Sequence, residues 1–240
     1  MMIDAKDMHY TELCRQVRES GDADITINNC CGQRYIAAGL KNKRIVINGT
    51  PGNALGAYLD GCDITVNGSA QDATGDTMNA GAIHVFGNCG DGAGYGMRGG
   101  RIYVKGDIGY RAGIHMKAYK EACPIIVIGG KAGSFLGEYQ AGGLIIVLGL
   151  TGGDRPIVGD FCGTGIHGGK IVLRTKDAPA DLPVQVNSHR ATEQDMAEIK
   201  PVIGDFCSVF GLDKDAILSG DFTILTPNTA NPYRHHYTHH

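Results

Sequence analysis

Three stretches of the chain decide how it folds, because they share one five-residue pattern. They are Ile64-Thr65-Val66-Asn67-Gly68, Ile83-His84-Val85-Phe86-Gly87 and Ile102-Tyr103-Val104-Lys105-Gly106. Each reads Ile-x-Val-x-Gly, so that two branched apolar side chains point to the same face of an extended strand. A unit this short has too little apolar surface to be buried alone, but stacked copies bury a continuous core.

The pattern continues outward from these stretches in both directions. Further copies are Ile25-Thr26-Ile27-Asn28-Asn29, Ile45-Val46-Ile47-Asn48-Gly49, Ile125-Ile126-Val127-Ile128-Gly129, Ile145-Ile146-Val147-Leu148-Gly149 and Ile171-Val172-Leu173. The terminal glycines from Gly49 to Gly149 are spaced 19, 19, 19, 23 and 20 residues apart. Between the copies a Gly-x-x-x-Gly motif recurs, at Gly52/Gly56, Gly90/Gly94, Gly109/Gly113, Gly133/Gly137 and Gly159/Gly163.

This repeat predicts an all-β fold: a single-stranded, right-handed parallel β-helix, a solenoid of about seven coils with glycines at tight corners. A left-handed β-helix of hexapeptides and a calcium-binding nonapeptide array are disfavoured, because neither period is visible in the sequence. The glycine triplet of residues 92–96 lacks a following helix, which disfavours a dinucleotide site.

Composition divides the chain into three predicted segments. Of its 37 glycines, 34 lie between Gly21 and Gly169. We predict a capping helix in residues 1–20, the repeat domain in 21–175, and a helical and extended C-terminal docking segment in 176–240. The apolar stripe Tyr10, Leu13, Cys14 and Val17 predicts the first helix. In the last segment we expect a helix capped near Thr192 and broken or kinked at Pro201, a strand at 222–225 and an extended tail at 231–240.

Charge and cysteine content exclude several classes of protein. The net charge of −3 gives no basic patch for nucleic acid. Hydrophobic residues make up 42% of the chain, which is enough for a sizeable core. We find no apolar run long enough for a membrane helix and no secretory signal, so a cytoplasmic location is expected. The eight cysteines form no C-x-x-C pair, which favours buried thiols over a metal or cluster site.

The residues that could carry chemistry are scattered relative to the repeat. His84, His115 and His167 fall at different phases, and the aspartates at 60, 63, 72, 76, 91 and 107 are expected in turns without a shared repeat position. The terminal histidines at 235, 236, 239 and 240 suggest adventitious metal affinity only. We therefore assign no catalytic, cofactor-binding or metal-binding residue. Five tyrosines are expected to project from the repeats as interface anchors: Tyr95, Tyr103, Tyr110, Tyr119 and Tyr139.

With its Gly-x-x-x-Gly motifs and Ile-x-Val-x-Gly strands, the chain resembles the GXGXG domain that closes the large subunit of glutamate synthase. The resemblance is strong from Asp24 to Arg174 and weaker through the C-terminal segment. In that family the domain is a β-helix without catalytic residues. It supports a glutaminase domain and an FMN-containing synthase domain, between which ammonia is channelled.

The resemblance implies a non-catalytic structural subunit of a glutamate synthase-type complex, which makes glutamate from glutamine, 2-oxoglutarate and a reductant. The implied partners are a glutaminase subunit and an FMN synthase subunit, and FMN and iron–sulfur clusters would lie in the partner rather than in this chain. The alternatives are the GXGXG subunit of formylmethanofuran dehydrogenase, the corresponding subunit of N-methylglutamate synthase, or a β-helix acyltransferase. The tail after the repeats favours the glutamate synthase group. A homo-oligomer is compatible with the sequence.

Overall fold

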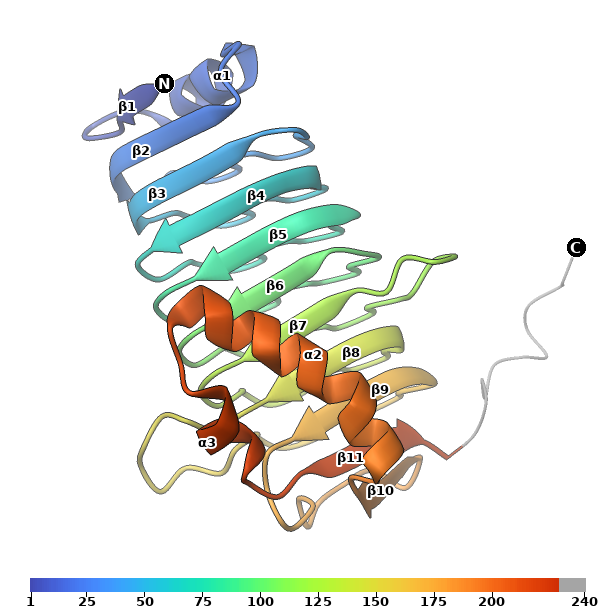
Figure 1. Ribbon diagram of the computed structural model, residues 1–240. Coiled ribbons are helices and arrows are strands. Elements are labelled where there is room, and N and C mark those ends of the chain that lie inside the picture. The colour runs from blue at the N-terminus through green and yellow to red at the C-terminus, as the bar shows by residue number, and fades with distance from the viewer. Residues whose placement is uncertain (229–240) are drawn as a thin grey trace, which may run out of the picture.

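The computed structural model describes residues 1–228, and its main feature is one sheet of eleven strands (Figure 1). Nine strands follow one another in parallel and in chain order: β1 (Met2–Asp4), β2 (Asp24–Cys31), β3 (Arg44–Thr50), β4 (Asp60–Asn67), β5 (Ala80–Val85), β6 (Arg101–Val104), β7 (Ile125–Ile128), β8 (Ala141–Val147) and β9 (Gly168–Leu173). The last two, β11 (Thr223–Pro227) and β10 (Val186–Arg190), add to β9 in antiparallel fashion.

The predicted stacking of the repeat strands is confirmed. Ile64 pairs with Ile83 and Ile83 with Ile102, and each of these side chains is buried. The copy that begins at Ile125, however, lies one residue out of the predicted register, since Ile102 pairs with Ile126 rather than with Ile125. Both faces of β7 are largely buried, so its uninterrupted apolar run carries no alternation from which the register could be read.

The predicted fold class is wrong. The regular strands form one open, mixed sheet with helices on one face, a sheet-based α/β arrangement rather than an all-β right-handed parallel β-helix. The return part of each repeat is a series of turns instead of a strand, because alternate residues there have positive φ. Only single-residue bridges, such as Ala70 to Cys89 and Cys89 to Ile108, join these turns in strand fashion. The chain then reverses after β9, which makes the end of the sheet antiparallel.

The main core lies between the inner face of the sheet and the turn segments. Its residues include the Ile and Val side chains of the strands and, from the turns, Leu55, Ala93 and Ala112. Two turn glycines explain the Gly-x-x-x-Gly motif. Gly94 and Gly113 both have φ of +68°, and a Cβ there would lie 2.5 Å and 2.6 Å from an isoleucine Cδ1 of the core.

The first end of the stack is covered by α1 (Tyr10–Glu19), as the apolar stripe predicts. Leu13 and Val17 of this helix are fully buried against the core. The short strand β1 was not predicted; it pairs with β2 and forms the edge of the sheet.

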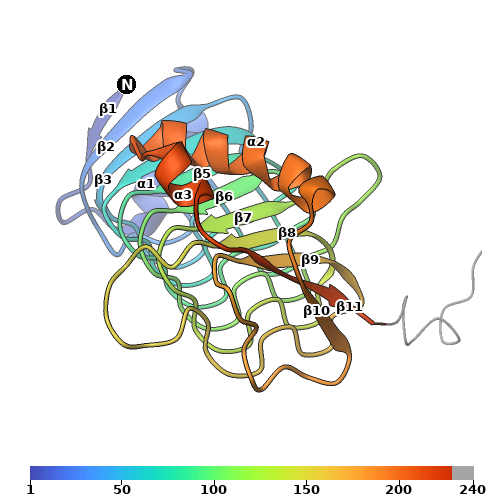
Figure 2. The same cartoon turned by 60° about the horizontal axis from the view of Figure 1, so that its bottom comes forward.

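A second layer covers part of the outer face of the sheet. The helix α2 (Glu193–Phe210) crosses the strands β6–β9 on the side opposite the turn segments, followed by the short α3 (Lys214–Leu218) (Figures 1 and 2). The predicted cap at Thr192 is confirmed, but α2 continues unbroken through Pro201. The predicted tail at residues 231–240 lies outside the described residues.

Candidate functional site

A large hollow lies on the outer face of the sheet, beside the C-terminal half of α2. It has a volume of about 860 Å³. Small residues at the beginning of the strands form its floor, among them Ala80, Gly81, Ala82 and Gly100. Because these side chains are short, the sheet surface is lower here than beneath α2.

His84 lines this hollow, and one of its ring nitrogens has no hydrogen-bond partner among the described residues. Its ring stacks on the buried Tyr103 ring, with 5.5 Å between centroids and 27° between planes. Its Nε2 atom is shielded from solvent and has no hydrogen-bond partner among the described residues. Burial lowers the pKa of His84 below its ordinary value of 6.5, so the imidazole is neutral at neutral pH.

Three charged residues line the hollow: Asp63, Arg101 and Asp205. An exposed ion pair joins Arg101 of β6 to Asp205 of α2, with 3.3 Å between the charged atoms. Cys123, whose side chain is exposed, also lines the hollow, and partial desolvation raises the pKa of its thiol, which favours the thiol form over the thiolate. The hollow thus has the features of a contact surface and does not pair an activated nucleophile with a base.

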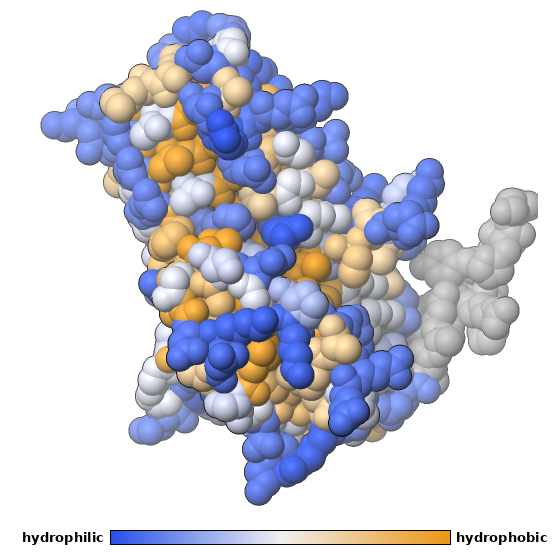
Figure 3. Space-filling view, viewed as in Figure 1, coloured by the Kyte–Doolittle hydropathy of each residue, from blue (hydrophilic) through white to orange (hydrophobic). Residues whose placement is uncertain are grey.

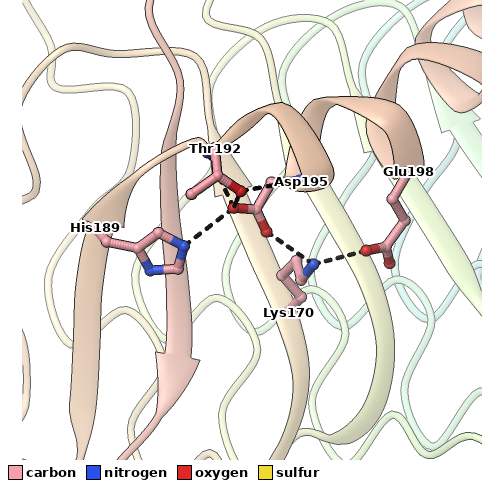
Figure 4. A network of polar contacts seen from close by, with 5 residues as sticks. All are labelled: Lys170, His189, Thr192, Asp195 and Glu198. Atoms are coloured by element: carbon pink, nitrogen blue, oxygen red, sulfur yellow. Dashed lines mark hydrogen bonds and ion pairs between the residues drawn. The ribbon is translucent and has the colours of Figure 1, made fainter.

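A polar network holds the beginning of α2 on the sheet (Figure 4). Asp195 lies at its centre, where one carboxylate oxygen is 3.1 Å from Lys170 Nζ of β9 and the other is 3.2 Å from His189 Nε2 of β10. Thr192 donates to Asp195 at 2.7 Å and accepts from its backbone N–H, and Lys170 also binds Glu198 at 2.7 Å.

These contacts change the charge properties of the network. Burial alone would raise the pKa of Asp195, but hydrogen bonds from Thr192, together with Lys170 and His189, hold that pKa well below its ordinary value. Burial alone would lower the pKa of Lys170, but Glu198 and Asp195 raise it. The Asp195 carboxylate and the Lys170 ammonium are thus engaged in the helix cap and in ion pairs. We therefore interpret the network as a structural attachment of α2 to the sheet.

Aromatic rings gather on the turn side of the molecule, opposite α2. His115 lies between Tyr95 and Tyr139, at centroid distances of 5.8 Å and 5.2 Å. Beside them Phe135 and Phe161 stack at 5.0 Å. We call these five residues the aromatic row. All of its members except Phe135 are exposed.

Charged groups fix the row in place. The Arg111 guanidinium lies over the Phe135 ring at 5.2 Å and pairs with Glu138 at 3.3 Å. Two further exposed tyrosines, Tyr58 and Tyr110, belong to the same turn segments. Rigid, exposed aromatic rings with an adjacent arginine are typical of protein–protein contact surfaces.

The sequence-based expectations for single residues were met in part. Tyr95, Tyr110, Tyr119 and Tyr139 are exposed, whereas Tyr103 is buried beneath α2, so its predicted role as a projecting anchor is wrong. Five cysteines are buried as expected, but Cys31 and Cys123 are exposed. The histidines stay apart, because His84 lies on the outer face of the sheet and His115 on the turn side.

The expected position of the aspartates in turns is confirmed for Asp72, Asp76 and Asp91 but not for all six. Asp60 and Asp63 lie in β4 rather than in a turn. Asp72 and Asp91 do share one repeat position, and each accepts a hydrogen bond from a backbone N–H of the next repeat, at 2.9 Å and 2.8 Å. Their spacing of 19 residues is the signal that was available in the sequence. These carboxylates satisfy backbone donors, which is a structural role.

The described residues offer neither a metal-binding cluster nor a membrane-spanning helix. Within residues 1–228 the side chains of His, Cys, Asp and Glu form no group of three that is arranged to hold a metal ion. In the same part of the chain, each helix is too short or too polar to cross a bilayer.

Comparison with other proteins adds two findings. The chain is 45% identical over 251 residues to an uncharacterized protein of Methanocaldococcus jannaschii, and the alignment covers 99% of this chain and 96% of that protein. A chain in the crystal structure of the formyltransferase/hydrolase complex from Methylorubrum extorquens, solved with methylofuran, superimposes with a TM-score of 0.63. That match covers 92% of this chain and 88% of the other at 20% identity, which demonstrates similarity of fold alone.

The family comparison explains the glycine pattern from which the fold was read. The family model described as the GXGXG motif matches residues 22–228, and this range includes all the repeat strands from β2 to β9 as well as the helices on the outer face. Because the match extends over most of the chain, the protein belongs to the GXGXG family.

Proposed function

We propose that this chain is a non-catalytic structural subunit of a glutamate synthase-type complex, in which it holds a glutaminase subunit and an FMN-containing synthase subunit in fixed relation. The aromatic row carries the proposal. It presents several exposed rings at fixed spacing on a stack of repeats whose backbone groups are hydrogen-bonded from one repeat to the next.

A rigid support suits this role for a physical reason. If ammonia passes between two active sites, a small displacement of one site relative to the other lowers the rate strongly. The row is held by stacking and by Arg111, so its rings lose little freedom on binding a partner. FMN and iron–sulfur clusters belong to the synthase partner in this proposal, and the chain itself carries no cofactor.

A second candidate is the corresponding subunit of another complex that uses this domain, such as formylmethanofuran dehydrogenase or N-methylglutamate synthase. The likeness of fold to a chain of the formyltransferase/hydrolase complex is the observation that favours it. Both candidates require the chain to bind partner subunits, and they differ in which partners bind.

Co-purification tests the proposal directly. The full chain is expressed with tagged glutaminase and FMN synthase subunits from the same organism, and complex formation is followed by size-exclusion chromatography. We expect a complex of three subunits, glutamine-dependent glutamate formation by that complex, and no turnover by the isolated chain. Exchange of Tyr95 and Tyr139 for serine should weaken assembly, whereas the exposed Tyr119→Ser serves as the control.

Two outcomes would contradict the proposal. One is turnover by the purified chain alone. The other is failure to bind either subunit while binding the subunits of a formyl-transferring complex, which would favour the second candidate.

A further inference from the structure

A row of polar side chains runs along the step between the turn segments and the strands. Asn79, Arg98 and Lys117 occupy the same position in three consecutive repeats. The backbone N–H of each donates to a carbonyl group one repeat earlier, at 2.8 Å for Asn79 and at 2.9 Å for the other two. This backbone ladder places the three side chains next to one another at about the 4.8 Å spacing of paired strands.

The two cations in this row have no compensating partner. Arg98 and Lys117 are exposed, and neither makes an ion pair or a side-chain hydrogen bond within the described residues. Elsewhere the stack alternates charge: Asp24, Arg44 and Asp63 are register neighbours, and Arg44 pairs with Asp24 at 2.5 Å. Like charges in neighbouring positions repel each other, and an anion bound between them would remove that repulsion.

A cavity opens at this row. It has a volume of about 420 Å³ and is lined by Asn79, Arg98, Lys117 and Tyr119. Every lining side chain carries a hydrogen-bond donor, and none is a carboxylate. Lys120 is outside the lining; its ammonium lies 5.3 Å from the centre of the Tyr119 ring, and Glu121 follows it in the same turn.

One wall of the cavity comes from an insertion in the repeat. The paired isoleucines Ile64, Ile83 and Ile102 are 19 residues apart along the chain. The next partner, Ile126, lies 24 residues after Ile102. The extra residues form a tight turn in which Tyr119 and Ala122 exchange two backbone hydrogen bonds of 3.0 Å (Figure 1). The lengthened repeat carries Lys117, and the repeat directly before it carries Arg98.

We propose that this cavity binds a small dianion of the carboxylate or phosphate class. The planar guanidinium of Arg98 binds two oxygen atoms of one anionic group, and the ammonium of Lys117 binds a second group or a third oxygen. The Asn79 amide and the Tyr119 hydroxyl complete the shell. Two unpaired cations match two negative charges. This inference is independent of the partners proposed above.

Titration calorimetry of the purified full chain tests the proposal with three probes: succinate, inorganic phosphate and the monoanion acetate. We expect succinate or phosphate to bind more tightly than acetate, and the tighter of the two identifies the chemical class. Arg98→Gln and Lys117→Gln should each weaken that binding by about tenfold or more, because each removes a charge-assisted contact.

Lys41→Gln is the matched control. Lys41 is exposed and precedes the row at the same repeat position, but the next residue in its stack is Asp60, a carboxylate. Binding by this variant should equal that of the wild type, and all variants should keep the wild-type thermal midpoint because the exchanged side chains are exposed. The proposal is overturned if neither dianion binds, if acetate binds equally well, or if Arg98→Gln and Lys117→Gln bind like the control.

Discussion

The outer face of the sheet has two halves, one covered by α2 and one without a helix above it, and their outward side chains differ. Over β6–β9 the central outward side chains are apolar or aromatic, and α2 buries them: Tyr103, Val127, Ile146 and Val172. Over β2–β4 the equivalent side chains are Thr26, Val46 and Thr65, which remain partly exposed without a helix above them. Figure 3 shows the face outside α2 as a mixed polar and apolar surface.

The uncovered half is adapted to water by contacts along the strands. Asn67 donates to Asn48, and Asn48 donates to Asn28, both at 2.7 Å. Asp24 and Arg44 form an ion pair at the other margin. Because a face built in this way needs no cover, the partner-binding surface should be sought on the turn side, where exposed aromatic rings gather.

The largest contrast between the halves is expected from one matched pair of substitutions. Val127 and Val46 occupy the same outward position, but Val127 is fully buried and Val46 is not. Val127→Asp should lower the free energy of unfolding by about 3 kcal/mol or more, because an unpaired charge is buried. Val46→Asp should cost less than about 1 kcal/mol. Urea denaturation of both variants measures the difference, and equal losses would refute the division.

A second pair tests how firmly α2 is attached. Phe206 of α2 is fully buried against the sheet, and its ring lies 5.6 Å from the Tyr103 ring, whereas Phe86 is partly exposed at the edge of the contact, 4.9 Å from the Phe210 ring. Phe206→Ala should cost about 3 kcal/mol, as for other buried aromatic residues. Phe86→Ala should cost much less. If thermal and denaturant unfolding show a larger loss of stability for Phe86→Ala than for Phe206→Ala, α2 does not pack on the sheet through Phe206.

The attachment of α2 should also depend on pH. The pKa of Asp195 is lowered in the folded protein, so its contribution to stability is fully present above the ordinary carboxyl value of 3.8 and is lost as the pH falls below it. Asp195→Asn should therefore cost about 1 kcal/mol at neutral pH and progressively less in acid. A variant whose deficit stays constant from neutral pH down to acid unfolding would show that the carboxylate does not hold the helix. The measurement is unfolding followed by circular dichroism at several pH values.

The smallest effect concerns the turn side, where two glycines with almost the same φ differ in their surroundings. At Gly113 a Cβ would lie 2.6 Å from Ile145 Cδ1, whereas at Gly92 nothing lies within 4 Å. Gly92→Ala should cost about 1 kcal/mol through backbone strain alone, and Gly113→Ala should cost more. Equal thermal midpoints for the two variants would show that close packing does not explain the motif.

The two halves also explain what could be read from the sequence. Where one face is solvated, alternation is visible, and the register of Ile64, Ile83 and Ile102 was predicted correctly. Where α2 covers the second face, the run Ile125–Ile128 is apolar throughout, so the register was missed by one residue. The return segments were predicted as part of a β-helix, but their left-handed turn conformations prevent regular strands there. Glycine composition alone does not distinguish such turns from the corners of a β-helix.

The candidate sites were less accessible to sequence reasoning. His84 and the residues of α2 are more than 100 positions apart in the chain, so their hollow depends on where the helix returns. The pairing of Arg98 with Lys117 was readable in principle from their 19-residue spacing. Tyr103 was expected to be exposed because the helix that buries it could not be placed on a particular strand.

The central claim is that the chain binds partner subunits through its turn side, and radical footprinting of tyrosine rings tests it most directly. The rings are labelled in the isolated chain and in the complex with the glutaminase and FMN synthase subunits, and labelling is quantified by mass spectrometry. We predict strong protection of Tyr95 and Tyr139 in the complex and little change at Tyr119. Unchanged labelling of Tyr95 and Tyr139 in a complex that has formed would contradict the account.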